Sequence, residues 1–318
     1  MQKSIAVIDL NAIYNNALKI KKMLGNRRFY AVVKADAYGH GSIPVARKIQ
    51  HLVYGFCVAI IEEGIALRVA GVSAPILVFT PPQNRYDCDR AAAYNLTLTV
   101  NSLYAAKLAK GLSCEIKLNT GMNRLGCDIS ELDKIIQTVN KDSVVGIYSH
   151  MYAPQNDKIC AEQLEIFKRV KGYGIPLHIS ASGGLLKGGE YLFDGARCGI
   201  LLYGYPPEGF KAQGFKPALK VYAKKLQTTK CVGGGAGYAP APKNYQTLST
   251  YRLGYAEGFS RTHPLGINKL CMDTFISESS EEWLCVMDDA QEYAKRLGTI
   301  SYEVLVNCTH RAERIYEG

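Results

Sequence analysis

Five basic or polar residues stand at or just after the ends of successive apolar runs. They are Lys34, Arg124, His150, Ser182 and Arg197. A lysine amine can act as a nucleophile or a base, and a guanidinium group suits a carboxylate or a phosphate. Taken alone, a lysine at the end of an apolar run is usually a solvated charge. The repeated placement makes these five residues a coherent set of candidate site residues.

The apolar runs are expected to be parallel strands, because helical patterns separate them. The eight runs cover residues 29–34, 54–61, 75–79, 96–100, 114–119, 144–149, 176–180 and 192–197. Helices are expected over residues 62–70, over 130–140 with Ser130 as the N-cap, and over 161–170. Eight strand–helix repeats predict a closed (β/α)8 TIM barrel, an α/β fold whose active sites lie at the C-terminal ends of the strands.

The alternation of strand and helix patterns stops after about Pro217. Strands are expected over residues 219–227, 246–253 and 270–276, with turn-rich pieces such as Gly233 to Gly237 between them. The sequence therefore predicts a barrel domain over residues 1–217 and a second, mainly β C-terminal domain over 218–318. The first ten residues could belong to either domain.

Composition excludes several classes of protein. With 318 residues, 47% of them hydrophobic and 21% charged, the chain is globular rather than disordered or fibrous. Its longest apolar stretch, roughly residues 52–61, is about half the length that a membrane-spanning helix needs. No signal-peptide pattern opens the sequence, so we expect a cytoplasmic protein without a membrane segment.

Charge and cysteine usage point to no nucleic-acid partner and no metal. The net charge is +10, but no stretch concentrates Lys and Arg with interleaved aromatic residues, which favours a generally basic surface. The 10 cysteines contain no C-x-x-C pair, which favours buried thiols over disulfides or a zinc cluster. A metal hydrolase is disfavoured, because the histidines show no H-E-x-x-H spacing and Ser182 lies in no G-x-S-x-G motif.

The sequence around Lys34 narrows the chemistry. Residues 30–41 read YAVVKADAYGHG and closely resemble the cofactor-lysine motif of the bacterial alanine racemases, which use pyridoxal 5'-phosphate. Seven further segments follow in the order of that family: KLNTGMNRLG, SHMYAP, HISASGG, ARCGILLYG, LGYAEGFSR, CMD and GTISYE. One such motif would be weak, whereas eight in order along nearly the whole chain are strong.

The resemblance assigns the cofactor site. It implies that Lys34 is linked to the cofactor aldehyde and that Tyr38 contacts the phosphate. Loops after the seventh and eighth strands commonly bind phosphate in barrels, and here they contain Ser182, Gly199 and Ile200. Arg197 is expected to face the pyridine nitrogen, to which a guanidinium can only donate a hydrogen bond. The ring then stays unprotonated, which suits racemisation and suppresses transamination. Related decarboxylases have a glutamate near this point.

Racemisation needs a base on each face of the α-carbon. The resemblance implies that Lys34 is one base and that Tyr255, from a partner subunit, is the other, which implies a homodimer with shared active sites. His150 is expected to face the cofactor and to link to Tyr255, and Arg124 to pair with the substrate carboxylate or orient cofactor oxygens. The remaining expected substrate contacts are Met272, Asp273 and His310.

The chain departs from the family pattern at several positions. His310 stands where the family usually has a tyrosine, Asn119 where it has aspartate, Ala181 where it has asparagine, and Glu257 and Phe259 where it has aspartate and tyrosine. Lys117 matches a lysine that carries a carbamate in several members. The chain is also short for the family, with brief segments after Arg261 and Asp273.

The sequence thus predicts a racemase that interconverts L- and D-alanine, with a small amino acid as its substrate. Racemisation of serine or of another small or basic amino acid remains an alternative, since a pocket that differs by one hydroxyl or methylene discriminates weakly. A non-catalytic pyridoxal-phosphate-binding protein is the second alternative. Known single-domain binders of that kind lack a second domain, so Tyr255 and the CMD segment argue against it.

Overall fold

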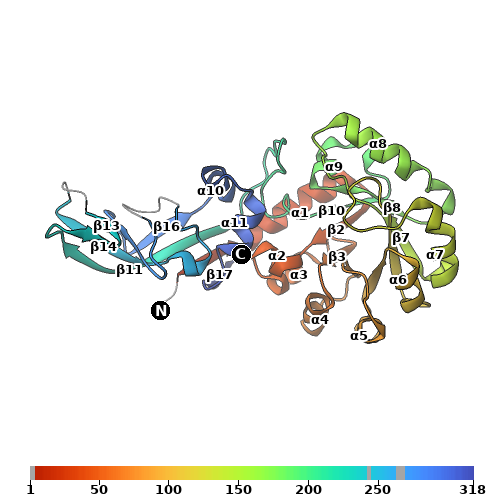
Figure 1. Ribbon diagram of the computed structural model, residues 1–318, viewed down its shortest axis with the longest axis horizontal. Coiled ribbons are helices and arrows are strands. Elements are labelled where there is room, and N and C mark those ends of the chain that lie inside the picture. Colours follow the sequence, from red (N-terminus) through yellow and green to blue (C-terminus); the bar gives the residue numbers. More distant parts are fainter. Residues whose placement is uncertain (1–3, 242–244, 263–268) are drawn as a thin grey trace. The chain divides into compact units, whose positions relative to one another are not determined.

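The computed structural model describes residues 4–241, 245–262 and 269–318 (Figure 1). The chain divides into two compact units, which are described separately. The barrel unit comprises Ile13–Ala37 and Ser42–Phe215, and the second unit comprises Met1–Ala12, Tyr38–Gly41 and Lys216–Gly318. Among the described residues, no helix has the length and apolar character needed to cross a membrane.

The barrel unit is built on one parallel sheet. Its strands are β2 (Arg28–Val32), β3 (Gly55–Val58), β4 (Ile76–Val78), β5 (Thr97–Val100), β6 (Cys114–Lys117), β7 (Val144–Tyr148), β8 (Leu177–His178), β9 (Ser180–Ala181) and β10 (Gly195–Cys198). They pair in the order β8-β7-β6-β5-β4-β3-β2-β10-β9. The two end strands, β8 and β9, are halves of the single strand expected over 176–180 and are separated only by Ile179. The sheet is therefore nearly closed on itself, which confirms the barrel prediction.

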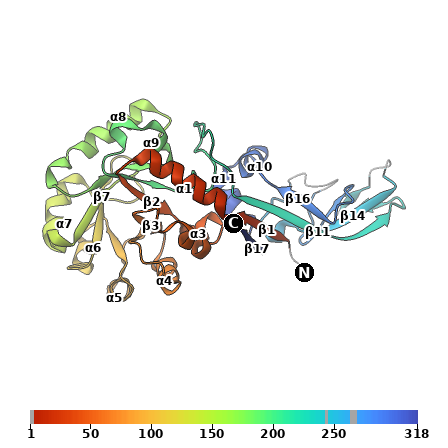
Figure 2. The ribbon, with the colours of Figure 1, turned by 180° about the vertical axis from the view of Figure 1, so that it is seen from behind.

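Helices lie outside this sheet (Figures 1 and 2). They are α1 (Leu10–Leu24), α3 (Ser42–Ile49), α4 (Ile61–Val69), α5 (Arg85–Ala93), α6 (Leu103–Leu108), α7 (Leu132–Val139), α8 (Asp157–Lys168) and α9 (Ser182–Lys187). The short segment α2 (Lys34–Tyr38) contains left-handed backbone angles and is a turn at the end of β2. Asn84, Ser102 and Asn156 cap α5, α6 and α8 through their side-chain oxygens, as expected for helix N-termini.

One predicted cap is wrong. Ser130 was expected to begin a helix, but it lies inside a short 3-10 turn, Ile129–Glu131, which Asp128 caps. The carboxylate of Asp128 accepts hydrogen bonds from both the backbone N–H and the hydroxyl of Ser130. The longer acidic side chain thus takes the capping role, and α7 begins only at Leu132.

The second unit is centred on a six-stranded sheet. Its strands are β1 (Ile5–Asp9), β11 (Leu219–Lys230), β14 (Thr247–Arg252), β15 (Phe275–Ser277), β16 (Trp283–Met287) and β17 (Glu313–Glu317), with a small hairpin of β12 (Gly235–Ala236) and β13 (Ala239–Pro240) beside it. Strand β1 pairs antiparallel with β11 and parallel with β17. The first residues of the chain therefore belong to this unit. Two helices, α10 (Ala290–Leu297) and α11 (Ser301–Asn307), accompany the sheet.

The strand expected over residues 270–276 is corrected to a loop followed by a short strand. Strand β15 begins only at Phe275. The carbonyl groups of Cys271 and Met272 accept hydrogen bonds from Tyr255 and Ala256, and Cys271 donates to Thr274. These backbone groups serve a pair of loops instead of a sheet ladder.

All ten cysteines are free thiols, and seven of them are buried, which agrees with the expected apolar role.

Candidate active site

Lys34 lies two residues after the end of β2, where an unusual turn follows the strand. Ala35, Asp36, Ala37 and Tyr38 all adopt left-handed backbone conformations, with φ between 50° and 55°. Such conformations cost L-residues about 1–2 kcal/mol each. Glu63 and Asp36 offset part of this cost, because their carboxylates accept hydrogen bonds at 2.7 Å from the N–H groups of Ala35 and Ser42. The turn therefore holds Lys34 at a fixed place at the C-terminal end of its strand.

Four cationic side chains interact electrostatically at this end of the barrel: Lys34, Lys117, Arg124 and Arg197. Burial, followed by the charge of Arg124, lowers the pKa of Lys34. Burial and the charges of Arg197, Arg124 and Lys34 lower the pKa of Lys117 to about 8. A lowered pKa favours the neutral, nucleophilic form of an amine, and a cluster of cations attracts an anionic ligand.

Arg197 is enclosed by the ends of β7 and β8. Its side chain is 3% exposed. The guanidinium donates to the carbonyl oxygens of Ser149, His178 and Ile179, at 3.0 Å for His178 and 3.3 Å for Ile179. It also lies 5.0 Å above the ring of Tyr148. Several contacts on different strands fix its direction, as precise recognition of a ligand requires.

His150 lies beside Arg197, with its Nδ1 atom 3.5 Å from Nη2 of the arginine. Burial and the neighbouring charges, Arg197 foremost, lower the pKa of His150 to about 3. The imidazole is therefore neutral at physiological pH. Its backbone carbonyl accepts a hydrogen bond from Gln163, which anchors the loop after β7.

The loops after β9 and β10 form a second part of the site. Ser182, Gly199 and Ile200 are buried there, and the N–H of Leu201 donates to the hydroxyl of Ser182 at 3.5 Å. The N–H groups of Gly199 and Ile200 have no backbone acceptor in the part of the chain that the structure describes. Backbone N–H groups without a backbone acceptor can donate hydrogen bonds to the oxygens of a phosphate.

Arg124 occupies an exposed loop that Asn119 organises. The side-chain oxygen of Asn119 accepts hydrogen bonds from the N–H groups of Gly121 and Asn123, both at 3.1 Å. Asparagine therefore supplies the same turn-forming acceptor that aspartate would. The guanidinium of Arg124 is left exposed, where a mobile carboxylate can reach it.

The second unit brings together three other expected site residues, Tyr255, Met272 and Asp273. Tyr255 lies in the loop 254–258 and donates its N–H to the carbonyl of Cys271 at 3.2 Å. Its side chain is 38% exposed. Met272 is exposed and Asp273 is half-buried. The remaining two candidates in this unit are Tyr38, which is buried beside the ring of Tyr302, and the exposed His310.

A buried glutamate supports the Tyr255 loop. Glu257 accepts hydrogen bonds from Arg252 at 2.8 Å and from the N–H of Gly254 at 2.7 Å. Arg311 lies 3.5 Å from Glu257 and 3.0 Å from Asp273, so it joins the two loops. The substitution of glutamate for the family's aspartate at position 257 thus still yields a closed ion-pair network.

Gly254 allows these two loops to approach each other. A Cβ atom at this position would lie far inside van der Waals contact with the carbonyl oxygens of Cys271 and Met272. We expect Gly254→Ala to lower the free energy of unfolding by about 1–3 kcal/mol and to reduce turnover, because the Tyr255 loop must shift. Urea unfolding measures the first effect. Gly172→Ala, where a Cβ meets nothing within 4 Å, should change stability by less than about 0.5 kcal/mol. Equal effects of the two substitutions would contradict this account.

Burial of Lys117 predicts a pH-dependent cost in stability. Its pKa falls from 10.5 to about 8 on folding, so the folded state disfavours its charged form. The cost is full below pH 8 and disappears as the pH rises through 10.5. In the cofactor-free protein, Lys117→Met should therefore increase the free energy of unfolding by about 1–3 kcal/mol at pH 7.

At pH 10.5 the gain from Lys117→Met should be nearly absent. Urea unfolding at both pH values, in buffer free of carbon dioxide so that the amine is unmodified, checks this expectation. Lys107→Met, at an exposed position on α6, is the matched control and should show no such pH dependence. A gain of equal size at both pH values would show that the charge of Lys117 is not the cause.

Four buried residues around Arg197 were missed from the sequence: Tyr30, Glu115, Tyr148 and His178. One signal could have identified Glu115. It lies two residues before Lys117 on β6, and residues at this spacing on a strand face the same side. His178 lies in the HISASGG motif, which by itself predicts no role for this residue.

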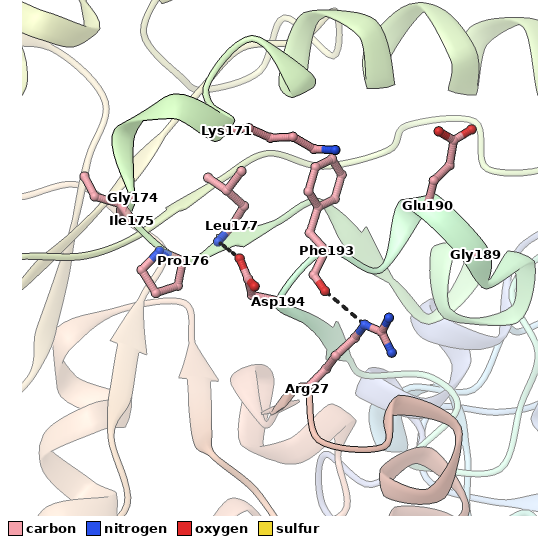
Figure 3. A pocket seen from close by; sticks show the side chains of 10 residues that line it. All are labelled: Arg27, Lys171, Gly174, Ile175, Pro176, Leu177, Gly189, Glu190, Phe193 and Asp194. Atoms are coloured by element: carbon pink, nitrogen blue, oxygen red, sulfur yellow. Dashed lines mark hydrogen bonds between the residues drawn. The ribbon is translucent and has the colours of Figure 1, made fainter.

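A separate pocket of about 610 Å³ lies at the other ends of the strands (Figure 3). Leu177 begins β8, and Asp194 directly precedes β10. The polar groups are engaged internally: Arg27 donates to the carbonyl of Phe193 at 3.0 Å, and Asp194 accepts from the N–H of Leu177 at 2.8 Å. Residues at this end of a barrel usually serve stability, so the pocket is separate from the candidate active site.

Comparisons with known proteins identify the family of this chain. Residues 8–207 match the family described as alanine racemase, N-terminal domain. The alanine racemase of Clostridium perfringens (strain SM101 / Type A) is 32% identical over 375 residues, which cover 98% of this chain and 95% of that protein. Because the alignment is longer than the 318 residues here, the relative carries additional residues.

Two solved structures extend the comparison to the fold. The alanine racemase of Corynebacterium glutamicum matches with a TM-score of 0.84 at 27% identity and covers 100% of both chains. That of Bartonella henselae, solved with covalently bound pyridoxal phosphate, matches with a TM-score of 0.84 at 26% identity and covers 99% of both chains. Sequence and fold agree over both units, and this chain belongs to the alanine racemase family.

Proposed function

We propose that this protein is a pyridoxal-phosphate-dependent alanine racemase that interconverts L- and D-alanine. The observation that carries the proposal is the pairing of a lysine of lowered pKa with a buried arginine on adjoining strands. Lys34 follows β2 and Arg197 lies on β10, and these two strands pair in parallel. The family membership established above agrees with this chemistry.

The residues present fit pyridoxal phosphate. A nucleophilic amine suits its aldehyde, donor-only Arg197 suits its ring nitrogen, and the backbone N–H groups of Gly199 and Ile200, with the hydroxyl of Ser182, suit its phosphate. Tyr38 is assigned to the phosphate by the family motif. Pyridoxal phosphate held in this way would supply an electron-withdrawing ring that makes the α-hydrogen of the amino acid acidic once the substrate amine has displaced that of Lys34, which leaves the Lys34 amine free to act as a base.

The side chains of the protein then move the proton. Lys34 takes or returns it on one face of the α-carbon, and the phenol of Tyr255 does so on the opposite face. The neutral His150 positions Tyr255 by hydrogen bonding, and Arg124 binds the substrate carboxylate. Arg197 donates a hydrogen bond to the ring nitrogen and thereby keeps this nitrogen unprotonated, which limits transamination.

Met272, Asp273 and His310 are assigned to the substrate side of the site. We place them, with Tyr255, in the active site of a partner subunit, so the protein acts as a homodimer with shared sites. Asp273 is held by Arg311 at 3.0 Å, which gives the Met272 loop a defined position. The cytoplasmic location remains a prediction.

The test of function uses purified protein with added cofactor. Loss of optical activity is followed from L-alanine and, separately, from L-serine. Faster turnover of alanine supports the proposal, and faster turnover of serine supports a serine racemase. Cofactor binding without turnover of either would instead support another substrate or a non-catalytic cofactor-binding protein.

A further inference from the structure

A carboxylate lies in the barrel interior, behind the arginine assigned to the cofactor ring. Glu115 is 2% exposed, and so is its neighbour His178. Carboxylates are almost never fully buried unless they are paired, because the loss of hydration is costly. Nothing in the mechanism above uses either residue, so their contacts require an explanation of their own.

His178 connects Glu115 to Arg197 through one hydrogen bond to each. The chemistry of the two partners decides which atom is the donor in each bond. Nε2 of His178 lies 2.7 Å from Oε2 of Glu115, and Nδ1 of His178 lies 2.6 Å from Nη1 of Arg197. A guanidinium has only donors, so Nδ1 must be the acceptor and carry no proton. An ionised carboxylate has only acceptors, so Nε2 must carry the proton. The two partners together select one neutral tautomer of His178.

The protonation states agree with this geometry. Burial, together with the charge of Arg197, lowers the pKa of His178 although the adjacent Glu115 raises it, so the imidazole is neutral. Burial opposes the ionisation of Glu115, yet His178, Tyr30 and Arg197 hold its pKa below the ordinary value. The three residues therefore form one negative, one neutral and one positive group with no net charge.

Aromatic packing fixes the orientation of the histidine ring. It is stacked between Tyr30, at 4.7 Å, and Tyr148, at 5.3 Å, with interplanar angles of 18° and 8°. Tyr30 also donates its hydroxyl to Oε1 of Glu115 at 3.0 Å, so both carboxylate oxygens are engaged. The imidazole cannot turn over without breaking this stack.

We propose that Glu115 is a positioning residue that holds Arg197 toward the cofactor ring by fixing the tautomer of His178. This inference rests on the proposed function, because the placement of Arg197 against the ring nitrogen follows from the assignment as a racemase. Without the carboxylate, the ring is free to take the other tautomer, which would present an N–H to the guanidinium. Arg197 would then lose an acceptor and the negative charge that offsets its own.

The test compares Glu115→Gln, Tyr30→Phe and the control Thr99→Val. Glutamine keeps the shape and removes the charge. Thr99 is hydrogen-bonded to the hydroxyl of Tyr148 at 2.8 Å, so its replacement removes a buried hydrogen bond beside the aromatic stack but leaves the stacked rings and the charged groups in place. Histidines labelled with 15N in the ring report the tautomer by NMR in the cofactor-free protein, and His178→Asn assigns the signal.

In the unaltered protein we expect a neutral His178 with its proton on Nε2. Glu115→Gln should move the 15N resonance of Nε2 downfield and that of Nδ1 upfield, as the proton shifts toward Nδ1. It should also raise the dissociation constant of pyridoxal phosphate about tenfold, as for the loss of a charge-assisted hydrogen bond. It should lower kcat with little change in the KM for alanine, because Arg197 contacts the cofactor and not the substrate. Tyr30→Phe should produce smaller changes in the same direction, and Thr99→Val should produce neither.

Two results would overturn the inference. One is a His178 that carries its proton on Nδ1 or on both nitrogens in the unaltered protein. The other is a Glu115→Gln variant, or a Tyr30→Phe variant if the first does not fold, with unchanged ring signals and cofactor affinity. Failure of the proposed function is separate from both, since the NMR and binding measurements require no turnover. A protein that shows both expected effects but racemises nothing would refute only the racemase assignment.

Discussion

Lys34→Ala should abolish racemase turnover, with a loss of at least about 10³-fold, since covalent attachment and one of the two proton transfers both depend on this amine. Coupled detection of D-alanine formed from L-alanine measures the loss. The turn after Lys34 is fixed by carboxylates that bond to the backbone, at Ala35 and Ser42, so we expect the variant to fold. Lys107→Ala, at an exposed position on α6, is the matched control and should retain full activity.

A second readout makes the Lys34 prediction independent of activity. Borohydride reduction of the protein with pyridoxal phosphate should attach the cofactor to the peptide that contains Lys34, and mass spectrometry should find no such adduct in Lys34→Ala. Lys117 is the nearest competitor, because its pKa is lowered to about 8 and its amine is also nucleophilic. An adduct on Lys117 in the unaltered protein would contradict the assignment of Lys34.

The sequence predicts the barrel well because strand and helix alternate with clear periodicity there. It also places Lys34, Arg124, His150, Ser182 and Arg197 in one unit, at the strand ends where barrel active sites lie. What the sequence cannot show is the interior behind Arg197. Glu115 and His178 are 63 residues apart in the chain, and only closure of the sheet brings their side chains to 2.7 Å.

The second unit is less predictable for a different reason. Strand β17, near residue 318, pairs in parallel with β1, near residue 1. No local sequence pattern can predict a pairing between segments so far apart in the sequence. Residues 270–274 have strand-like composition, yet their carbonyls bond to the Tyr255 loop. Tertiary contacts decide the conformation at both places, in preference to local propensity.

Tyr255→Phe should lower turnover by about 10²- to 10⁴-fold, the usual range for the loss of a general acid–base group. The variant keeps Lys34, so it should still exchange the α-hydrogen of one enantiomer of alanine with deuterated water, on the face that Lys34 reaches. Exchange from the other enantiomer should be lost. Mass spectrometry of recovered alanine measures both. Tyr238→Phe, an exposed tyrosine in the same unit, is the control and should leave turnover unchanged.

Mixing the two inactive variants tests whether sites are shared between subunits. If Tyr255 acts in the partner's barrel, a dimer of one Lys34→Ala chain and one Tyr255→Phe chain has one site with both native residues. Random exchange makes half of the dimers mixed, so activity should return to about a quarter of the native value. If Lys34 and Tyr255 of the same chain form each site, every mixed dimer contains one defect per site and no activity returns. Subunit exchange is verified with differently tagged chains, so an absence of recovered activity would refute the shared site and leave the two-base assignment to the exchange experiment.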